Sequence, residues 1–420
     1  MRDNSWLQTT TGLVIVLVAV QFLTGVLLAF YYVPSVDHAY TTVSYVEKVV
    51  SSGSWIRSLH HYGSQWLTVF VFVHVIRLFL DRAYALNRIQ WIAAILLLGL
   101  VMAAGGTGYS LPWDARAFFS TRVAEGLMAG LPIAGGMARL WLLGGSDISP
   151  VTLSRFFALH VLVIPALIGF VVVWRLFRSQ LAELFGPRDA IVGALVFVVL
   201  GLWALKHPAP LGPPVAEAGA DYLPRPGAQF LWLYQSLKYI PGGLGSIVSV
   251  VLPGIVLAVL VALPWLKRQR LIAGSLLGLG VVLVVLMTTV SYLSDRRDPR
   301  TAQQFARQAA AEEAWRRQPF NPATITLAAG VTASGGAPEM YTKFCASCHG
   351  TQGQGAQQGP LKFPPLLDVP SKPRRSVDDI VALLKDPPAY GLQPPMRSFS
   401  GKLTEEQMRE IAEWIVKLKR

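Results

Sequence analysis

Both cysteines of the chain lie in one short motif near the C-terminus, Cys345-Ala-Ser-Cys348-His349. At this spacing two thiols can add to the vinyl groups of a haem while the following imidazole binds the iron. A thioredoxin-like CxxC needs no following histidine, and a structural zinc site needs a fourth ligand that the nearby sequence does not offer. The motif therefore predicts a covalent haem c with His349 as an axial ligand.

The second axial ligand of this iron is expected further along the chain. Met396 follows two prolines and precedes the amphipathic segment LTEEQMREIAEWIVKL, whose predicted N-cap is Thr404. An early CxxCH, a proline-flanked methionine and a final helix together resemble class I cytochromes c, which implies that Met396 is the ligand. Met408 is the rival, but it lies inside the helix and is predicted to be core. His/Met ligation raises the potential of the iron, which suits an electron acceptor.

Two further histidines lie in an apolar run, LHHYGSQWLTVFVFVHVIR, at residues 59–77. Histidine is costly in lipid and is usually functional there. His60 and His74 lie near one face of the predicted helix, but about 21 Å apart along its axis, so they cannot share one metal. The pair could serve two stacked haems, each completed by a ligand from another helix.

Membrane-spanning helices must position these motifs. The chain has 420 residues, of which 53% are hydrophobic and 15% charged. Its net charge of +13 is scattered singly, which argues against nucleic-acid binding. We therefore predict an all-α fold, a polytopic transmembrane bundle of about seven helices with a small α-helical domain at the C-terminus. The apolar stretches lie at 11–33, 59–80, 89–110, 156–178, 190–205, 246–266 and 271–293.

The composition changes after the last apolar stretch and predicts a division into domains. The membrane part is expected at 1–180 and 181–293, a polar linker at 294–338 and the cytochrome c domain at 339–420. Covalent haem attachment occurs outside the cytoplasmic membrane, so the C-terminal domain is expected in the periplasm of a bacterium, with the protein in its inner membrane. Seven crossings then place the N-terminus inside.

The membrane part resembles cytochrome b of the Rieske/cytochrome b complexes, which oxidise quinol. The stretches that carry the resemblance are QFLTGVLLAFYYVPSVDHAY, WIRSLHHYGSQ with FVHVIR, GTGYSLPWD and LSRFFALHVLVIP, and more weakly residues 224–293. In that family four histidines on two helices bind two haems. The resemblance assigns His60, His74 and His160 to three of these positions. The fourth falls at about 174 or 175, where the chain has Trp174 and Arg175.

The glycines that let a porphyrin lie against the helix backbone in that family show the same asymmetry. The resemblance places two of them at Gly25 and Gly108, near the outer surface, where both are present. Their inner partners, fourteen residues earlier, are Thr11 and Ala94. We therefore predict one haem b near the outer surface, between His60 and His160, and no complete inner site.

His74 is then expected to be a non-ligand, hydrogen-bonded to Arg175 or to another polar group. A five-coordinate haem at His74, or a second ligand supplied by another subunit, is the remaining alternative. His61 points to another face of its helix and is predicted to be structural.

The outer loop GYSLPWD, with the helices after it, resembles one wall of the family's quinol-oxidation site. Where the family has Pro-Glu-Trp-Tyr, with a carboxylate that takes a quinol proton, this chain has Pro-Gly-Ala-Gln, ending at Gln229. Glu217 and Asp221 in the same outer loop are candidate proton acceptors, although solvated loop acids are the simpler interpretation. Quinol is the expected substrate.

Together these features predict an electron-transfer subunit of a membrane quinol:cytochrome c oxidoreductase that fuses cytochrome b to cytochrome c. Its expected partners are a Rieske iron–sulfur protein, other complex subunits and a cytochrome c acceptor, in a dimeric complex. The alternative is a non-catalytic docking subunit whose working cofactor is haem c alone. A third hypothesis is a haem b quinone reductase that works in the opposite direction.

Overall fold

The computed structural model describes most of the chain. The described residues are 9–145, 148–178, 185–215, 218, 222–240, 244–320, 340–341, 344–345, 349, 353, 356–358, 361–363, 365–366, 376–390, 396, 398–400 and 403–418. They divide into two compact units, Met1–Phe320 and Asn321–Arg420. Each unit is described separately below.

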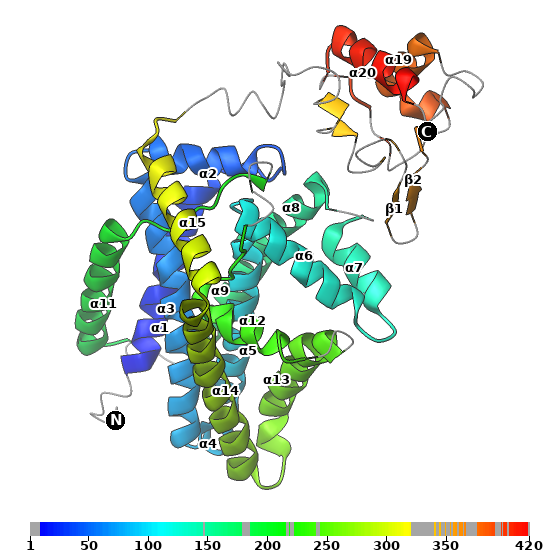
Figure 1. Ribbon diagram of the computed structural model, residues 1–420. Helices are drawn as coiled ribbons and strands as arrows, with labels where there is room; N and C mark the ends of the chain where they lie inside the picture. Colours follow the sequence, from blue (N-terminus) through cyan, green and yellow to red (C-terminus); the bar gives the residue numbers. More distant parts are fainter. Residues whose placement is uncertain are drawn as a thin grey trace. The chain divides into compact units, whose positions relative to one another are not determined.

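The first unit is a bundle of long helices (Figure 1). Its centre is formed by α1, α3, α5 and α9, which pack against one another in that order, while α11 packs on α1 and α3. α13 lies against α5, and α14 lies against α12. The long elements are α1 (Thr9–Ala29), α3 (Gly53–Leu80), α5 (Arg88–Tyr109), α9 (Ile164–Arg178), α11 (Pro187–Lys206), α13 (Leu252–Ala262) and α14 (Gln269–Arg297).

Shorter elements connect the long helices. They are α2 (Ala39–Lys48), α4 (Ala83–Leu86), α6 (Ala115–Ala129), α7 (Gly135–Leu143), α8 (Pro150–Phe157), the 3-10 turns η4 (Ala228–Phe230) and η7 (Leu263–Trp265), α12 (Leu231–Leu237) and α15 (Pro299–Arg317). Two π-helical segments, η2 (Ala158–Val163) and η6 (Ile247–Val251), lead into α9 and α13. α15 occupies the first half of the segment expected to be linker, and it packs on the first unit.

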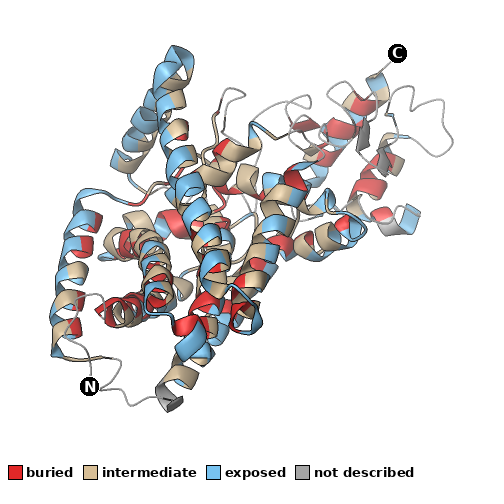
Figure 2. Ribbon diagram, turned by 90° about the horizontal axis from the view of Figure 1, so that it is seen from below, coloured by how far each residue is buried: buried red, intermediate tan, exposed pale blue. Residues whose placement is uncertain are grey.

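Seven of the described helical segments are long and apolar enough to cross a membrane. They are Thr9–Ala29, Gly53–Leu80, Arg88–Tyr109, Pro150–Arg175, Pro187–Lys206, Ile247–Trp265 and Gln269–Arg297. Their outward faces are exposed and apolar, as on α11, whereas the faces toward the bundle centre are buried (Figure 2). An exposed apolar face on a long helix is typical of contact with lipid. The predicted all-α membrane fold is therefore confirmed.

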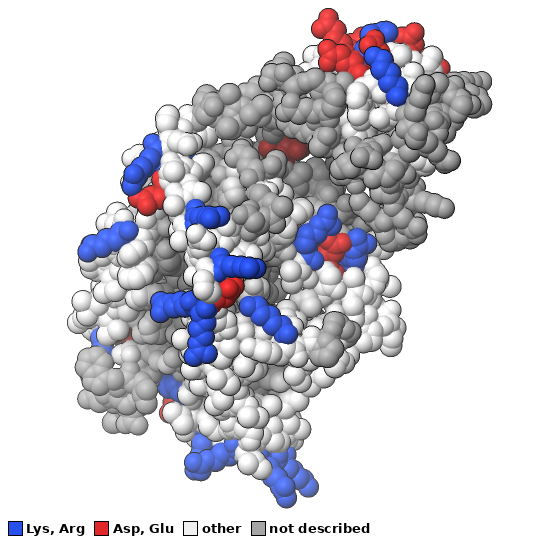
Figure 3. All heavy atoms as spheres, in the orientation of Figure 1, with Lys and Arg blue, Asp and Glu red and all other residues white. Residues whose placement is uncertain are grey.

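Basic side chains mark one end of this bundle. Arg82, Lys267, Arg268 and Arg270 are exposed where α3 meets α4 and where α13 meets α14. Figure 3 shows a group of Lys and Arg side chains at this end. The ends of spanning helices that carry such residues are typical of the cytoplasmic side of a membrane.

The second unit is a small helical domain with a buried core. Its described elements are α19 (Val377–Lys385), the 3-10 turn η9 (Pro387–Tyr390), α20 (Glu405–Lys417) and a two-stranded hairpin of β1 (Ala356–Gln358) and β2 (Leu361–Phe363). The strands are antiparallel, with Gln357 opposite Lys362. The predicted helical class holds, and the hairpin is an addition that the sequence did not reveal.

Candidate haem and quinol sites

His60 and His160 come from different helices and face each other inside the bundle. His60 lies on α3, and His160 lies in the π-helical segment η2. Their ring centroids are 6.1 Å apart, with ring planes inclined at 82°. Metal–nitrogen bonds of about 2 Å on both sides of one ion place two imidazole centroids about 6 Å apart. The spacing therefore suits one iron held between the two rings.

Hydrogen bonds at the Nδ1 atoms determine which ring nitrogen is free. The hydroxyl of Thr24 donates to the carbonyl of Val20 at 2.6 Å, so it accepts from Nδ1 of His60 at 2.9 Å. Nδ1 of His160 donates to the carbonyl of Ala104 at 3.0 Å. A proton on Nδ1 leaves the lone pair of Nε2 for a metal, which is the usual arrangement of a metal-binding histidine.

Two glycines make room beside these rings. A Cβ at Gly25 would lie 3.2 Å from Cε1 of His60, and a Cβ at Gly108 would lie 2.4 Å from Cε1 of His160. The second distance is one that side chains do not tolerate, so residue 108 must be glycine for the ring to keep this position. The histidines, their hydrogen bonds and the glycines together fit a bis-imidazole haem.

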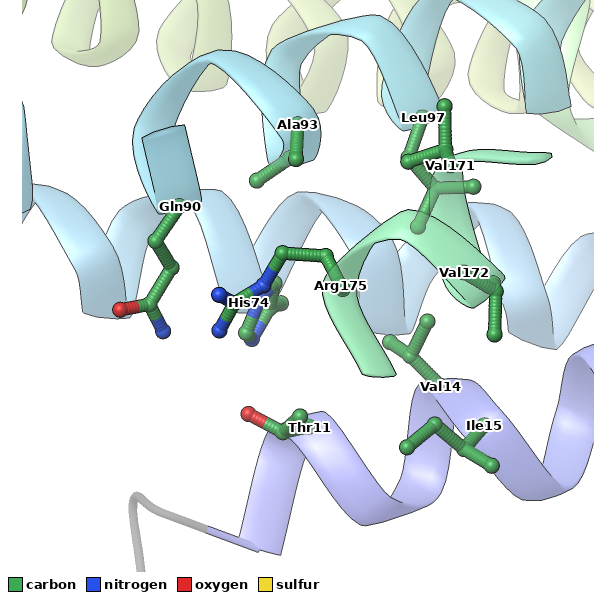
Figure 4. A pocket seen from close by; sticks show the side chains of 11 residues that line it. Thr11, Val14, Ile15, His74, Gln90, Ala93, Leu97, Val171, Val172 and Arg175 are labelled. Atoms are coloured by element: carbon green, nitrogen blue, oxygen red, sulfur yellow. The ribbon is translucent and has the colours of Figure 1, made fainter. Parts of the chain in front are cut away.

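The inner histidine has different surroundings. His74 is 7% exposed, and its Nδ1 is 3.0 Å from the hydroxyl of Thr10. It lines a cavity of about 70 Å³, together with Thr11, Ala94 and Arg175 (Figure 4). Cofactor pockets commonly have volumes of about 300–1,000 Å³. In the described part of the chain no imidazole faces His74 across this cavity, so the residues present do not fit a bis-imidazole haem.

The loop after α5 is held by a buried aspartate. Asp114 is 4% exposed, and its carboxylate accepts from the backbone N–H of Ala117 at 2.8 Å and of Gly212 at 2.6 Å. The first bond caps α6, and the second ties the loop to the segment after α11. Asp114 is therefore a structural residue of this wall.

The segment that replaces the family's glutamate packs against the end of α5. The side chain of Gln229 lies beside Gly105, and its Oε1 is buried with no hydrogen-bond partner among the described residues. The carbonyl of Arg225 accepts from the hydroxyl of Tyr109 at 2.7 Å. Arg225 also forms an ion pair with Asp295 of α14. The sequence analysis missed Asp295, because it lies in the polar end of the last span and no motif marks it.

α15 supplies further acidic and basic groups that the sequence analysis assigned to a linker. Glu312 accepts from Arg116 at 2.6 Å and from the backbone N–H of Leu211 at 2.9 Å. Arg316 pairs with Glu47 of α2, which also binds Arg57 of α3 at 2.6 Å. Helical spacing of charges in the sequence suggested a solvated helix, and it carried no signal for these long-range pairs.

The pKa of Glu47 reflects this network. Burial raises the pKa of its carboxyl, but the guanidinium groups of Arg57 and Arg316 outweigh burial and hold the pKa below its ordinary value. Glu47 is therefore a permanent anion that fixes α2, α3 and α15 to one another. Of the predicted proton acceptors, Glu217 and Asp221 lie outside the described residues.

In the second unit, the described members of the haem c motif lie at a buried core. Cys345 is 7% exposed, and the backbone N–H of His349 donates to its carbonyl at 2.9 Å, as in a helical turn. Met396 is partly buried against the core that contains Met408, which is 3% exposed. Thr404 caps α20 by accepting from the backbone N–H of Gln407 at 3.2 Å. Cys348 lies outside the described residues.

Comparison with known proteins defines the family. Residues 4–180 match the family model described as cytochrome b/b6/petB, and residues 337–419 match the cytochrome c model. The menaquinol:cytochrome c reductase cytochrome b subunit of Bacillus subtilis is 37% identical over 157 residues, which cover 37% of this chain and 70% of the relative. The chain belongs to the cytochrome b family.

Other relatives agree with this assignment. Cytochrome b6 of Prochlorococcus marinus (strain NATL1A) is 33% identical over 177 residues, 42% of this chain and 81% of the relative. A hyperthermophilic respiratory Complex III has a similar fold, with a TM-score of 0.57, 20% identity and coverage of 75% of this chain and 91% of that one. The predicted resemblance is confirmed: this is a cytochrome b domain fused to a C-terminal cytochrome c domain, as in a bc-type complex.

Proposed function

We propose that the chain is the electron-transfer subunit of a membrane quinol:cytochrome c oxidoreductase, with one haem b and one haem c. The observation that carries the proposal is the outer pair, His60 and His160, at a centroid distance of 6.1 Å with both Nδ1 atoms engaged. The relatives named as menaquinol:cytochrome c reductase subunits support the reaction class.

The residues divide the work of binding. His60 and His160 hold the haem b iron through Nε2, while Gly25 and Gly108 keep the space beside the rings open. Cys345 and Cys348 attach haem c, with His349 and Met396 as its axial ligands. When bound, these haems supply one-electron transfer.

We further propose that the inner haem site is lost. Arg175, rather than an imidazole, shares the inner cavity with His74, and Thr11 and Ala94 replace the glycines. An electron from quinol would then have no inward route through a second haem b and would leave toward the outer side, where haem c is proposed to lie.

The exposed basic end at Arg82 and Arg268 supports a cytoplasmic placement of that side. His60 and His160 then lie near the periplasmic side of a bacterial inner membrane. A Rieske iron–sulfur protein and a cytochrome c acceptor are the proposed partners in a dimeric complex.

One observation favours the docking-subunit alternative. Gln229 replaces the family's carboxylate, and the nearby Asp295 and Glu312 are each engaged by an arginine. An acid paired with arginine is a weak base, because the positive charge lowers its pKa. Quinol oxidation here would therefore need Glu217 or Asp221 as the proton acceptor.

A haem count tests the proposal. We expect the purified complex to give one pyridine-haemochrome b signal and one haem c signal per chain, and its haem b to be reduced by quinol in stopped-flow measurements. Haem c without haem b would favour the docking role. Haem b that is not reduced by quinol would contradict the catalytic role.

A further inference from the structure

The inner cavity has a polar end and an apolar interior. Thr11, His74, Gln90 and Arg175 provide its polar lining, and the other lining residues are aliphatic side chains of α1, α5 and α9 (Figure 4). The polar residues come from the first turns of α1 and α5 and from the last turns of α9. This is the end of the bundle that carries the exposed arginines.

Charge in this cavity is not balanced within the described residues. Arg77 lies nearby, since its guanidinium is 3.4 Å from the hydroxyl of Thr11, but it is paired with Asp81 at 2.8 Å. Arg175 has no carboxylate partner among the residues that the structure describes. An unpaired guanidinium at the edge of a membrane is costly, so an anionic partner would stabilise it.

The size and lining of the cavity limit the ligand. A volume of about 70 Å³ exceeds that needed for one water and is far below a porphyrin pocket. The N-terminal turns of α1 and α5 add positive potential. We propose that this cavity binds the phosphate headgroup of an anionic phospholipid from the cytoplasmic leaflet, with Arg175 as the charged contact and the aliphatic residues against the acyl chain.

This inference depends on the proposed loss of the inner haem. Both could fail independently, and two measurements separate them. The haem b count reports on the inner haem, and native mass spectrometry of the complex reports on retained lipid. Two haems b per chain would overturn both proposals. One haem b without retained lipid would overturn only the lipid site.

The test uses the full-length chain in its complex, reconstituted in nanodiscs of phosphatidylcholine containing phosphatidylglycerol. We expect one phosphatidylglycerol per chain to survive delipidation, and Arg175→Gln to weaken its retention about tenfold, as expected for the loss of one hydrogen bond from a charged group. Arg175→Lys should keep most of the retention. The matched control is Arg88→Gln, an exposed arginine at the same end, which should change nothing.

Inorganic phosphate distinguishes a free anion from a lipid. At 10 mM (roughly a saturating concentration for a weak anion site, Kd about 1 mM) it should not displace the lipid, because it lacks the acyl chains. Phosphate binding without lipid retention would overturn the lipid assignment. Equal retention by the wild type and Arg175→Gln would overturn the site.

Discussion

The outer and inner histidine sites are two versions of one arrangement on the same pair of helices. At the outer site Thr24 of α1 bonds Nδ1 of His60, and at the inner site Thr10 of α1 lies 3.0 Å from Nδ1 of His74. The two threonines and the two histidines are each fourteen residues apart. The half of each site formed by α1 and α3 is therefore preserved in this hydrogen bond.

The difference between the sites lies in what faces each histidine. His160 faces His60, whereas Arg175 lines the cavity beside His74. The comparison teaches that a buried, hydrogen-bonded histidine does not by itself make a haem site. The opposing imidazole and the absence of Cβ atoms beside the rings are also needed.

Removing the opposing imidazole should have the largest effect. We expect His160→Ala to abolish haem b, lowering its ratio to haem c from about one to near zero, because a single axial ligand binds far more weakly. His74→Ala is the control and should leave the ratio unchanged. Pyridine-haemochrome spectra measure both, and the covalent haem c serves as the internal standard. Loss of haem b in His74→Ala would break the comparison.

The glycine requirement can be tested by adding one methyl group. In Gly108→Ala the new Cβ would lie 2.4 Å from Cε1 of His160, so the ring must move and most of the haem b should be lost. Gly126→Ala is the matched control, because a Cβ at that position meets nothing within 4 Å. Equal haem content in the two variants would show that the glycine is not needed.

Rebuilding the inner site tests the comparison in the opposite direction. We expect Thr11→Gly, Ala94→Gly and Arg175→His together to raise the haem b count toward two per chain. Position 175 is chosen because Arg175 lines the cavity, whereas Trp174 is not among its lining residues. The same triple variant with Arg175→Leu is the control and should stay at one. An unchanged count in the histidine variant would mean that other features also exclude the inner haem.

Much of this asymmetry could be predicted from the sequence because it consists of residue types at fixed spacings. The seven spans followed from apolar length, and Thr404 followed from the preference of helix N-termini for hydroxyl side chains. Other features could not be predicted. The π-helical turn at His160 depends on packing, and the pairing of Glu312 with Arg116 joins residues 196 positions apart, for which no local pattern exists.

The ion-pair network at the outer end of α3 should affect the outer site and spare the inner one. Glu47 bonds Arg57, which lies three residues before His60, and its side chain is 4% exposed. Breaking such a buried pair costs about 3 kcal/mol. We therefore expect Glu47→Gln to lower the melting temperature of the complex and to loosen haem b, as measured by thermal release followed at the Soret band.

The same pair gives a pH dependence with a defined sign. The pKa of Glu47 is lower in the folded protein, so the stabilisation is complete above the ordinary glutamate pKa of about 4.3 and is lost as the pH falls through the lowered folded value. Wild type and Glu47→Gln should therefore converge in stability at acidic pH. Glu313→Gln, which removes an exposed pair on α15, is the control and should have little effect at any pH.

The smallest expected effect comes from the hydrogen bonds that the two sites share. Thr24→Val removes the acceptor for Nδ1 of His60, so the ring loses its orientation and becomes a weaker donor to iron, and haem b affinity should fall about tenfold. Thr10→Val makes the same change beside His74. With no haem there, the second variant should leave the haem b spectrum, affinity and midpoint potential unchanged. A spectral change in Thr10→Val would show that His74 does hold a haem, because the hydroxyl of Thr10 has no other route to the outer iron than through the length of α1 and α3.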